Sequence, residues 1–456
     1  MRSQPVIAIF DVGKTNKKLF LFDQNYNIVY ERSARFLETT DEDGDACENL
    51  ESLRLSVFDS LRHVFGKKEF NIKAINFSAY GASFVYLDED GSPVTPLYNY
   101  LKEYPQNLKE QFYQTYGGEE AFSLRTASPV LGSLNSGMQV YRIKYERPAL
   151  FQKIKHALHL PQYLSYLISG KACSDITSIG CHTNLWDFQE NGYHEWVRKE
   201  GIDAKLAPLA TYDEVSKAAF PGNNYLVGTG LHDSSAALIP YMVNFHEPFV
   251  LLSTGTWCIS LNPFNDTPLT IEELKQDCLC YLTYHGKQVK SSRLFAGQEH
   301  EDGVKRIAEH FNQDILKYRG VDFNPETVDR LQKQSGIKGE RKVLFAERDL
   351  SMFPNYETAY HQLMLDIMQQ QISSTQLVLI GSPVKRLFVD GGFSKNTIYM
   401  NLLATAFPQL EIYAASMAQA TSLGAALAIH QSWNKKPILN TLIQLQYYSA
   451  AQEMSV

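Results

Sequence analysis

Two segments of this chain share one local pattern, and that pattern restricts the possible folds more than any other feature of the sequence. Residues 6–22, VIAIFDVGKTNKKLFLF, are typical of a strand, a glycine-centred loop and a second strand. Residues 249–263, FVLLSTGTWCISLNP, repeat that order. When the two are superposed, Asp11 meets Ser253 and Gly13 meets Gly255. The repetition predicts a duplicated chain with two similar domains that face a cleft.

Apolar periodicity elsewhere predicts alternating strands and helices, which favours an α/β architecture. The second domain is expected to begin between residues 238 and 248, and we divide the chain into residues 1–243 and 244–456. Expected strands are Val6–Phe10, Leu19–Phe22, Ile28–Tyr30, Ile72–Phe77 and Lys385–Asp390, and expected helices are Glu51–Phe65, Pro148–Ile168, Tyr360–Leu379 and the small-residue segment Ala418–His430, which could pack very close to neighbouring backbone.

Composition limits the kinds of molecule that this protein could bind. The net charge of −7, from 43 basic and 50 acidic residues among 456, is unfavourable for binding a polyanion. No apolar run reaches the roughly 20 residues of a membrane span, and the first residues lack the apolar core of a signal peptide. Six cysteines are too few for a disulfide scaffold, and Cys278 and Cys280 lack zinc-site spacing. We expect a cytoplasmic protein acting on a small molecule, without nucleic-acid or membrane partners.

The first glycine loop contains Gly13-Lys14-Thr15, which invites comparison with the phosphate-binding pattern G-x-x-x-x-G-K-[ST]. Ala8 occupies the place of the first glycine, however, and a strand follows the loop where that pattern requires a helix. The sequence therefore predicts a phosphate-binding hairpin of another kind.

This hairpin offers groups for an anion and for a cation. Gly13 permits the positive φ that turns successive backbone amides toward one anion. Asp11, at the carboxyl end of a buried strand, is placed to hold Mg²⁺ through water. An ordinary hairpin turn with a capping aspartate is the alternative. The side-chain donors of the loop are Thr15, Asn16 and either Lys17 or Lys18.

Two further segments could face a phosphate or a nucleoside. Ser253, Thr254, Gly255 and Thr256 provide hydroxyl and backbone donors without an acid, which suits phosphate oxygens, although such residues are also common in hairpin turns. Gly391 and Gly392, followed by Asn396, would let a flat group approach the backbone. That segment is also typical of an ordinary turn between strand and helix.

The segment GLHDSSAAL places His232 and Asp233 before a short apolar stretch. Asp233 could cap a helix with its side chain. It could equally accept the proton of an alcohol that attacks phosphorus. A histidine in such a place is more often packed than catalytic.

These motifs together resemble the FGGY carbohydrate kinases of the actin-like ATPase superfamily, in family order and over almost the whole chain. DVGKTNKK and LLSTGTW are similar to the two phosphate motifs, GLHDSSAAL to the catalytic-aspartate segment, and RLFVDGGFSKN with QATSLGAALA to the adenosine motif and C-terminal helix. The resemblance implies two duplicated actin-like (ribonuclease H-like) domains closing on ATP, Mg²⁺ and a sugar. Asp233 would be the catalytic base, Asp11 the metal ligand, and the ATP ligands would be Asp11, Gly13, Lys14, Thr15, Asn16, Lys18, Ser253, Thr254, Gly255, Thr256, Gly391, Gly392 and Asn396.

Within that family, HDSSAA with STGTW and YGASFVYLDEDG look most like kinases of L-rhamnulose and L-fuculose. The reaction would place phosphate on a terminal hydroxyl, giving a 1-phosphate. Ser83 stands where those kinases carry Asp. Alternatives are a xylulose, ribulose or glycerol kinase, or a non-catalytic actin-like nucleotide-binding protein. The resemblance also allows a homodimer. Expected sugar contacts are Tyr80, Gly81, Ser83, Tyr100, His232 and Asp233.

Overall fold

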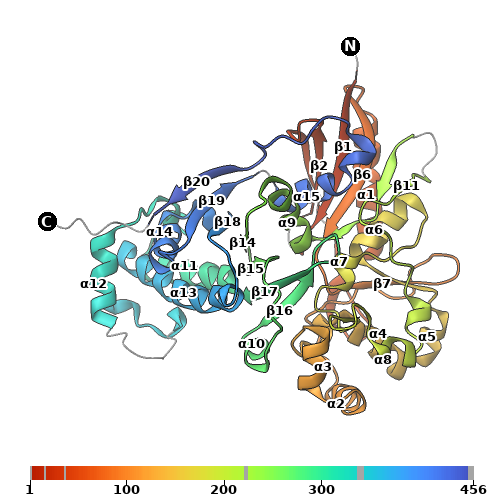
Figure 1. The fold of residues 1–456 in the computed structure, drawn as a ribbon, viewed down its shortest axis with the longest axis horizontal. Coiled ribbons are helices and arrows are strands. Elements are labelled where there is room, and N and C mark those ends of the chain that lie inside the picture. Colours follow the sequence, from red (N-terminus) through yellow and green to blue (C-terminus); the bar gives the residue numbers. More distant parts are fainter. Residues whose placement is uncertain are drawn as a thin grey trace.

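The computed structural model describes residues 3–14, 17–34, 37–219, 224–335, 344–417 and 419–449. Two mixed β-sheets lie beside each other, each flanked by helices, and the chain crosses between them after residue 244 (Figure 1). This arrangement confirms the predicted α/β class. Within the described ranges, no helix is both long and apolar enough to cross a membrane.

The first sheet is built on the first glycine hairpin. Strand β1 pairs antiparallel with β2 and parallel with β6, so the buried apolar run of β1 lies in the middle of the sheet. The sheet order is β11-β12-β6-β1-β2-β3, with β13 also pairing with β6. The strands are β1 Gln4–Val12, β2 Lys17–Asp23, β3 Ile28–Ala34, β6 Phe70–Ala79, β11 Val215–Lys217, β12 Leu226–Gly228 and β13 Leu231–His232.

The second sheet repeats that core. Strand β14 pairs antiparallel with β15 and parallel with β18, which reproduces the relation of β1 to β2 and β6. The predicted duplication of the hairpin is therefore confirmed. The order is β16-β17-β15-β14-β18-β19-β20, from β14 Phe249–Thr254, β15 Cys258–Asn262, β16 Cys278–Leu282, β17 Gln288–Leu294, β18 Arg386–Gly391, β19 Glu411–Ser416 and β20 Gln444–Tyr448.

Helices begin where the sequence supplies caps. The side chain of Asn49 accepts a hydrogen bond from Ser52 N at the start of α1, and Asn355 does the same for Thr358 N at the start of α13. The α-helices are α1 Leu50–Phe65, α2 Gln106–Thr115, α3 Glu119–Thr126, α4 Ser136–Glu146, α5 Pro148–Lys153, α6 Leu160–Ser169, α7 Ile176–Ile179, α8 Glu195–Lys199, α9 Asp233–Asn244, α10 Ile271–Lys275, α11 Ala296–His310, α12 Pro325–Ser335, α13 Tyr356–Leu379, α14 Thr397–Ala406, α15 Ala420–Ala428 and α16 His430–Trp433.

The predicted single helix over Pro148–Ile168 is wrong. The chain forms α5, then strand β8 His156–His159, then α6, which ends at Gly170 in the left-handed region. Strand β8 pairs antiparallel with β7 Phe84–Leu87, and the ring of His159 stacks on that of Phe84 at 3.9 Å between centroids. Pro161 has no amide hydrogen to donate, so it sits in the first turn of a new helix rather than inside a long one.

The C-terminal helix α15 returns to the first sheet. Its apolar residues join a core with Ile7 and Ile9 of β1. A Cβ atom on Gly424 would lie 1.9 Å from the backbone oxygen of Ala236 in α9. The expectation that this small-residue helix packs against neighbouring backbone is therefore confirmed, although Ala418 lies outside the described residues. The contact joins the last part of the chain to the first half.

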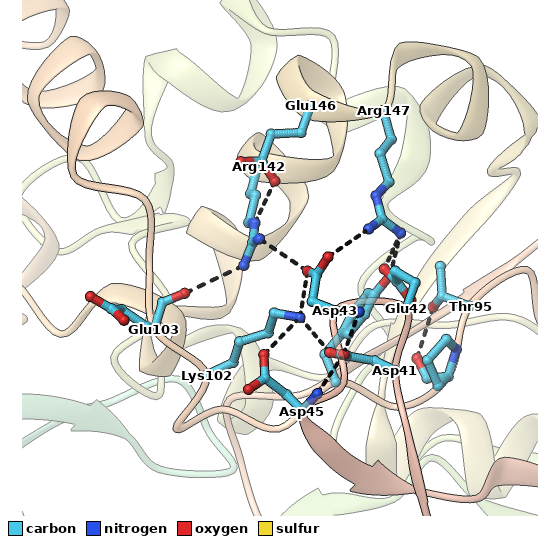
Figure 2. Close-up of polar contacts among 12 residues, drawn as sticks. Asp41, Glu42, Asp43, Asp45, Thr95, Lys102, Glu103, Arg142, Glu146 and Arg147 are labelled. Atoms are coloured by element: carbon cyan, nitrogen blue, oxygen red, sulfur yellow. Dashed lines mark hydrogen bonds and ion pairs between the residues drawn. The ribbon is translucent and has the colours of Figure 1, made fainter.

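An acidic hairpin also shapes the first half. Strands β4 Glu38–Thr40 and β5 Ala46–Glu48 form this hairpin, whose turn carries Asp41, Asp43 and Asp45. All three carboxylates surround the ammonium group of Lys102, with Nζ–O separations of 2.7 Å to Asp43 and 3.1 Å to Asp45 (Figure 2). The hairpin thereby anchors the segment that contains Lys102. The remaining short strands are β9 Trp186–Asp187 and β10 Gly192–Tyr193.

Candidate active site

A cavity of about 480 Å³ collects most of the predicted site residues from both halves of the chain. We call it the reaction cavity. A second cavity of about 650 Å³ shares Thr254 and Gly255 with it and extends into the second half, and we call it the C-terminal cavity. Predicted residues that line the reaction cavity are Lys14, Tyr80, Gly81, Tyr100, His232, Asp233, Ser253, Thr254, Gly255 and Thr256; Gly392 and Asn396 line the C-terminal cavity.

Asp233 lies at the start of α9 with its side chain 30% exposed in the reaction cavity. The residue in the N-cap position is His232, and Asp233 Oδ1 accepts a hydrogen bond from Ser234 N at 2.6 Å. These contacts fix the carboxylate but leave it accessible. Its position allows it to accept a proton from a hydroxyl group in the cavity.

His232 supports the carboxylate from behind. Its Nε2 lies 3.2 Å from Asp233 Oδ1 and 3.2 Å from the Sγ atom of Cys181. Burial lowers the pKa of His232, although the nearby Asp233 charge opposes this, so the ring is neutral at neutral pH. A neutral ring can orient Asp233 without neutralising its charge.

Asp11 is the residue before the last one of β1, and it contacts α15 from the other half of the chain. Its Oδ2 accepts hydrogen bonds from the hydroxyls of Thr421 at 2.5 Å and Ser422 at 2.9 Å, both on α15. Burial raises the pKa of Asp11, the hydroxyl hydrogen bonds lower it in part, and the charge of Asp233 raises it further. A cation between these two carboxylates would remove their mutual repulsion.

The residues present are suited to Mg²⁺ but not to a cage made of protein ligands. Across the ranges that the structure describes, no cluster of three or more metal-binding side chains occurs. Mg²⁺ commonly takes one or two carboxylates, several waters and substrate phosphates. Asp11 supplies such a carboxylate beside α15, although it does not line the reaction cavity, and it remains the candidate ligand.

The lysines of the first loop point in different directions. Lys14 lines the reaction cavity, whereas Lys18 forms an ion pair with Glu31 at 2.7 Å and lies beside a small cavity under β2. Thr15 and Asn16, which were expected to donate to phosphate, lie outside the described residues. Gly13 directly follows β1 and precedes Lys14.

The second loop is held by close backbone contacts. Gly391 has φ +89°, and a Cβ atom there would lie 1.9 Å from the backbone oxygen of Thr254. A Cβ atom on Gly297 would lie 1.9 Å from the backbone oxygen of Gly255. These glycines therefore bring three backbone segments together beside both cavities.

The C-terminal cavity offers a surface for a flat ring system. It is lined by Gly392 and Phe393 on one loop and by His300 and Tyr318 from a separate part of the second half. Asn396 caps α14 through Tyr399 N at 3.0 Å and donates to Tyr360 Oη at 2.7 Å. These two hydrogen bonds show that Asn396 has a structural role in addition to lining the cavity.

The sugar side of the reaction cavity differs from expectation at one residue. Tyr80, Gly81 and Tyr100 line the wall, but Ser83 is buried and does not contribute to it. Residues that sequence reasoning missed include Glu48, Arg293, Gly297 and Thr421, and of these only Gly297 carries a local signal, as a glycine at a helix start.

Comparison with known proteins agrees with this geometry. Residues 6–208 match the N-terminal domain of the FGGY family of carbohydrate kinases, and residues 246–437 match the C-terminal domain of carbohydrate kinase FGGY. The chain belongs to the FGGY carbohydrate kinases. One glycine hairpin lies in each of the two matched domains.

Relatives within the family carry several names. A rhamnulokinase of Halalkalibacterium halodurans is 22% identical over 280 residues, which cover 55% of this chain and 54% of that protein. A rhamnulokinase of Mannheimia succiniciproducens is 22% identical over 276 residues, covering 58% and 55%. The chain thus spans about half the length of these curated relatives.

Solved structures share the fold over nearly the whole chain. A carbohydrate kinase from Novosphingobium aromaticivorans has a TM-score of 0.79 at 22% identity, covering 98% of this chain and 95% of that one. A xylulose kinase from Lactobacillus acidophilus has a TM-score of 0.78 at 16% identity, covering 98% and 94%. At these identities the likeness establishes the fold alone and leaves the substrate open.

Proposed function

We propose that this protein transfers the γ-phosphoryl group of ATP to a terminal hydroxyl of a ketose. The observation that carries the proposal is the position of Asp233, an accessible carboxylate in a cavity that two glycine hairpins from different sheets also line. Two donor loops can hold a phosphate chain from opposite sides. A carboxylate between them can receive the proton of an attacking hydroxyl.

Asp233 Oδ accepts the proton of the sugar hydroxyl as its oxygen bonds to the γ-phosphorus. The bond between that phosphorus and the bridging oxygen of ADP breaks, and a sugar phosphate and ADP leave. His232, whose Nε2 lies 3.2 Å from Asp233 Oδ1, orients the carboxylate. Because little covalent chemistry falls to the protein, positioning supplies most of the rate.

Asp11 would hold Mg²⁺ through water, with Thr421 and Ser422 fixing the carboxylate that faces the ion. The ion would neutralise charge on the phosphate oxygens. The nucleoside of ATP would lie in the C-terminal cavity against Gly392 and Phe393. The phosphates would then pass Gly255 and Thr254, which border both cavities.

The substrate that we favour is an L-deoxyketose, L-rhamnulose or L-fuculose, phosphorylated to its 1-phosphate. The rhamnulokinase relatives and the segments HDSSAA and STGTW support this choice. Xylulose is the second candidate, because solved xylulose kinases share the fold over 98% of the chain. Ribulose, glycerol and gluconate complete the test set.

Coupled measurement of ADP release with Mg·ATP over this set tests the proposal, with Asp233→Asn assayed in parallel. General-base catalysis contributes about 10²–10⁴ in rate, so the variant should lose at least 100-fold in kcat while sugar binding persists. One sugar should stimulate ADP release strongly in the unaltered protein. Nucleotide binding without turnover on any sugar would favour the non-catalytic alternative, and kcat of Asp233→Asn within tenfold of the parent would remove its role as base.

A further inference from the structure

Lys14 follows the loop glycine Gly13 directly, and its side chain enters the reaction cavity. The side chain is 34% exposed. Its ammonium nitrogen lies over two cavity-lining rings, 5.6 Å from the centroid of Tyr80 and 5.4 Å from that of Tyr100. Aromatic faces attract a cation, so these rings help to hold the ammonium group in this place.

The carboxylate of Glu48 lies close enough to position the Lys14 ammonium group, but it leaves the hydrogen-bond donors of that group available. Glu48, at the end of the acidic hairpin, is buried and lies 2.9 Å from the Nζ atom of Lys17. It also accepts a hydrogen bond from Tyr80 Oη at 2.9 Å. Lys14 Nζ is farther away, at 3.6 Å, which exceeds the length of a good hydrogen bond. Since Glu48 already has closer partners, the donors of Lys14 remain available to another anion.

Two other cations near the loops, Lys18 and Arg293, are more firmly engaged. Lys18, which was also expected among the ATP ligands, is paired with Glu31 at 2.7 Å. Arg293 lines the reaction cavity, but it makes two hydrogen bonds to Asp277, at 2.6 Å and 3.1 Å, and its side chain is 6% exposed. Among these groups, Lys14 combines access to the cavity with the loosest ion pair.

The acidic hairpin holds in place groups on two sides of the Lys14 ammonium group. It ends in Glu48 beside Lys14. Its turn binds Lys102 (Figure 2), and Lys102 follows Tyr100 by two residues. The carboxylate and one of the two rings around the ammonium group are therefore anchored to the same element. Such support reduces the freedom of a long lysine side chain, which otherwise weakens its use in catalysis.

We propose that Lys14 is a catalytic residue, and that its ammonium group donates to the phosphoryl group while this group passes from ATP to the sugar. The inference rests on the proposed kinase function. Negative charge is spread over the oxygens of a transferring phosphoryl group, and a fixed cation beside them lowers the barrier. Asp233 and the second glycine hairpin border the same cavity, so the ammonium group faces the space where transfer would occur.

Steady-state kinetics of Lys14→Met, Lys14→Arg and Lys14→Ala with the best sugar test this role. Removing one donor to a transition-state anion costs about 10²–10³ in kcat, so Lys14→Met should lose that much while KM for the sugar stays within about threefold. Lys14→Arg should retain more activity than Lys14→Met. Ethylammonium ions should restore part of the activity of Lys14→Ala.

Lys199→Met is the matched control, since Lys199 forms an exposed ion pair with Glu195 on α8, outside both cavities. It should leave kcat within about twofold. With the parent enzyme active, a Lys14→Met kcat within threefold overturns the role of Lys14, as does a rise in sugar KM at unchanged kcat. Absence of turnover by the parent on every sugar would instead overturn the kinase proposal, and this inference with it.

Discussion

In each half of the molecule, an aspartate on one strand pairs in register with a serine on the neighbouring parallel strand. The two residue types have changed places between the halves. In the first sheet Asp11 on β1 stands opposite Ser78 on β6. In the second sheet Ser253 on β14 stands opposite Asp390 on β18. The hairpin strand carries the acid in the first half, and the neighbouring parallel strand carries it in the second.

This exchange gives the two carboxylates different surroundings. Asp11 meets hydroxyls from α15 and the charge of Asp233, and so belongs to the face between the two halves. Asp390 accepts a hydrogen bond from Gly391 N at 2.7 Å and lies beside Tyr241, which fixes the strand end behind the second loop. A duplicated fold thus places one copy of the carboxylate beside α15 and the charge of Asp233, while the other copy maintains a turn.

The largest difference between the halves should appear on removing each charge. Asp11→Asn should lower kcat by about 100-fold and raise the Mg²⁺ concentration needed for half-maximal rate, because the ion loses its carboxylate partner. Asp390→Asn should lower kcat less than tenfold. Mg²⁺ titrations of both variants check this expectation, and equal losses in the two would contradict the division of roles.

A smaller effect should follow from disturbing the packing of α15 against the first half of the chain. In Gly424→Ala the added methyl group would meet Ala236 backbone at 1.9 Å, so the helix must shift and the free energy of unfolding should fall by about 1–3 kcal/mol. Gly320→Ala is the control, because nothing lies within 4 Å of that Cβ position. Urea unfolding compares them, and equal stability of the two variants would contradict the close packing.

The smallest effect concerns pH. Burial raises the pKa of Asp390 to about 6, above its ordinary value of 3.8. Between these values the folded state holds more protons than the unfolded state, so the free energy of unfolding falls as pH rises from about 4 to 6. Asp390→Asn removes this contribution, and its stability relative to the parent should increase over that range. Urea unfolding at several pH values measures the stability difference between Asp390→Asn and the parent. A difference that does not change with pH would contradict the raised pKa of Asp390.

The sequence was most informative where the signal was local. Both glycine hairpins and their apolar strands follow from alternating residues around a glycine, and the structure has them at the expected positions. The small residues near Gly424 likewise predicted close packing. Local pattern was insufficient for Pro148–Ile168, where pairing of β8 with β7, from a distant part of the chain, overrides apparent helical continuity.

Contacts between distant segments account for what was missed in the site. Thr421 and Ser422 reach Asp11 from about 410 residues away, and no local pattern marks that encounter. Glu48 resembles any surface acid in the sequence, but the hairpin brings it beside Lys14. Ser83 lies in the segment that was expected to contact the sugar, yet it is buried just before β7, where β7 pairs with β8.

The central claim is that the cavity between the two glycine hairpins transfers phosphoryl groups to a sugar. Phosphorus NMR of a reaction with Mg·ATP and the best sugar of the panel tests this most directly, because it distinguishes a sugar phosphate from inorganic phosphate. The account predicts one new phosphate monoester per ADP formed, with little ADP formed in the absence of sugar. Formation of inorganic phosphate at the same rate with and without sugar would contradict it.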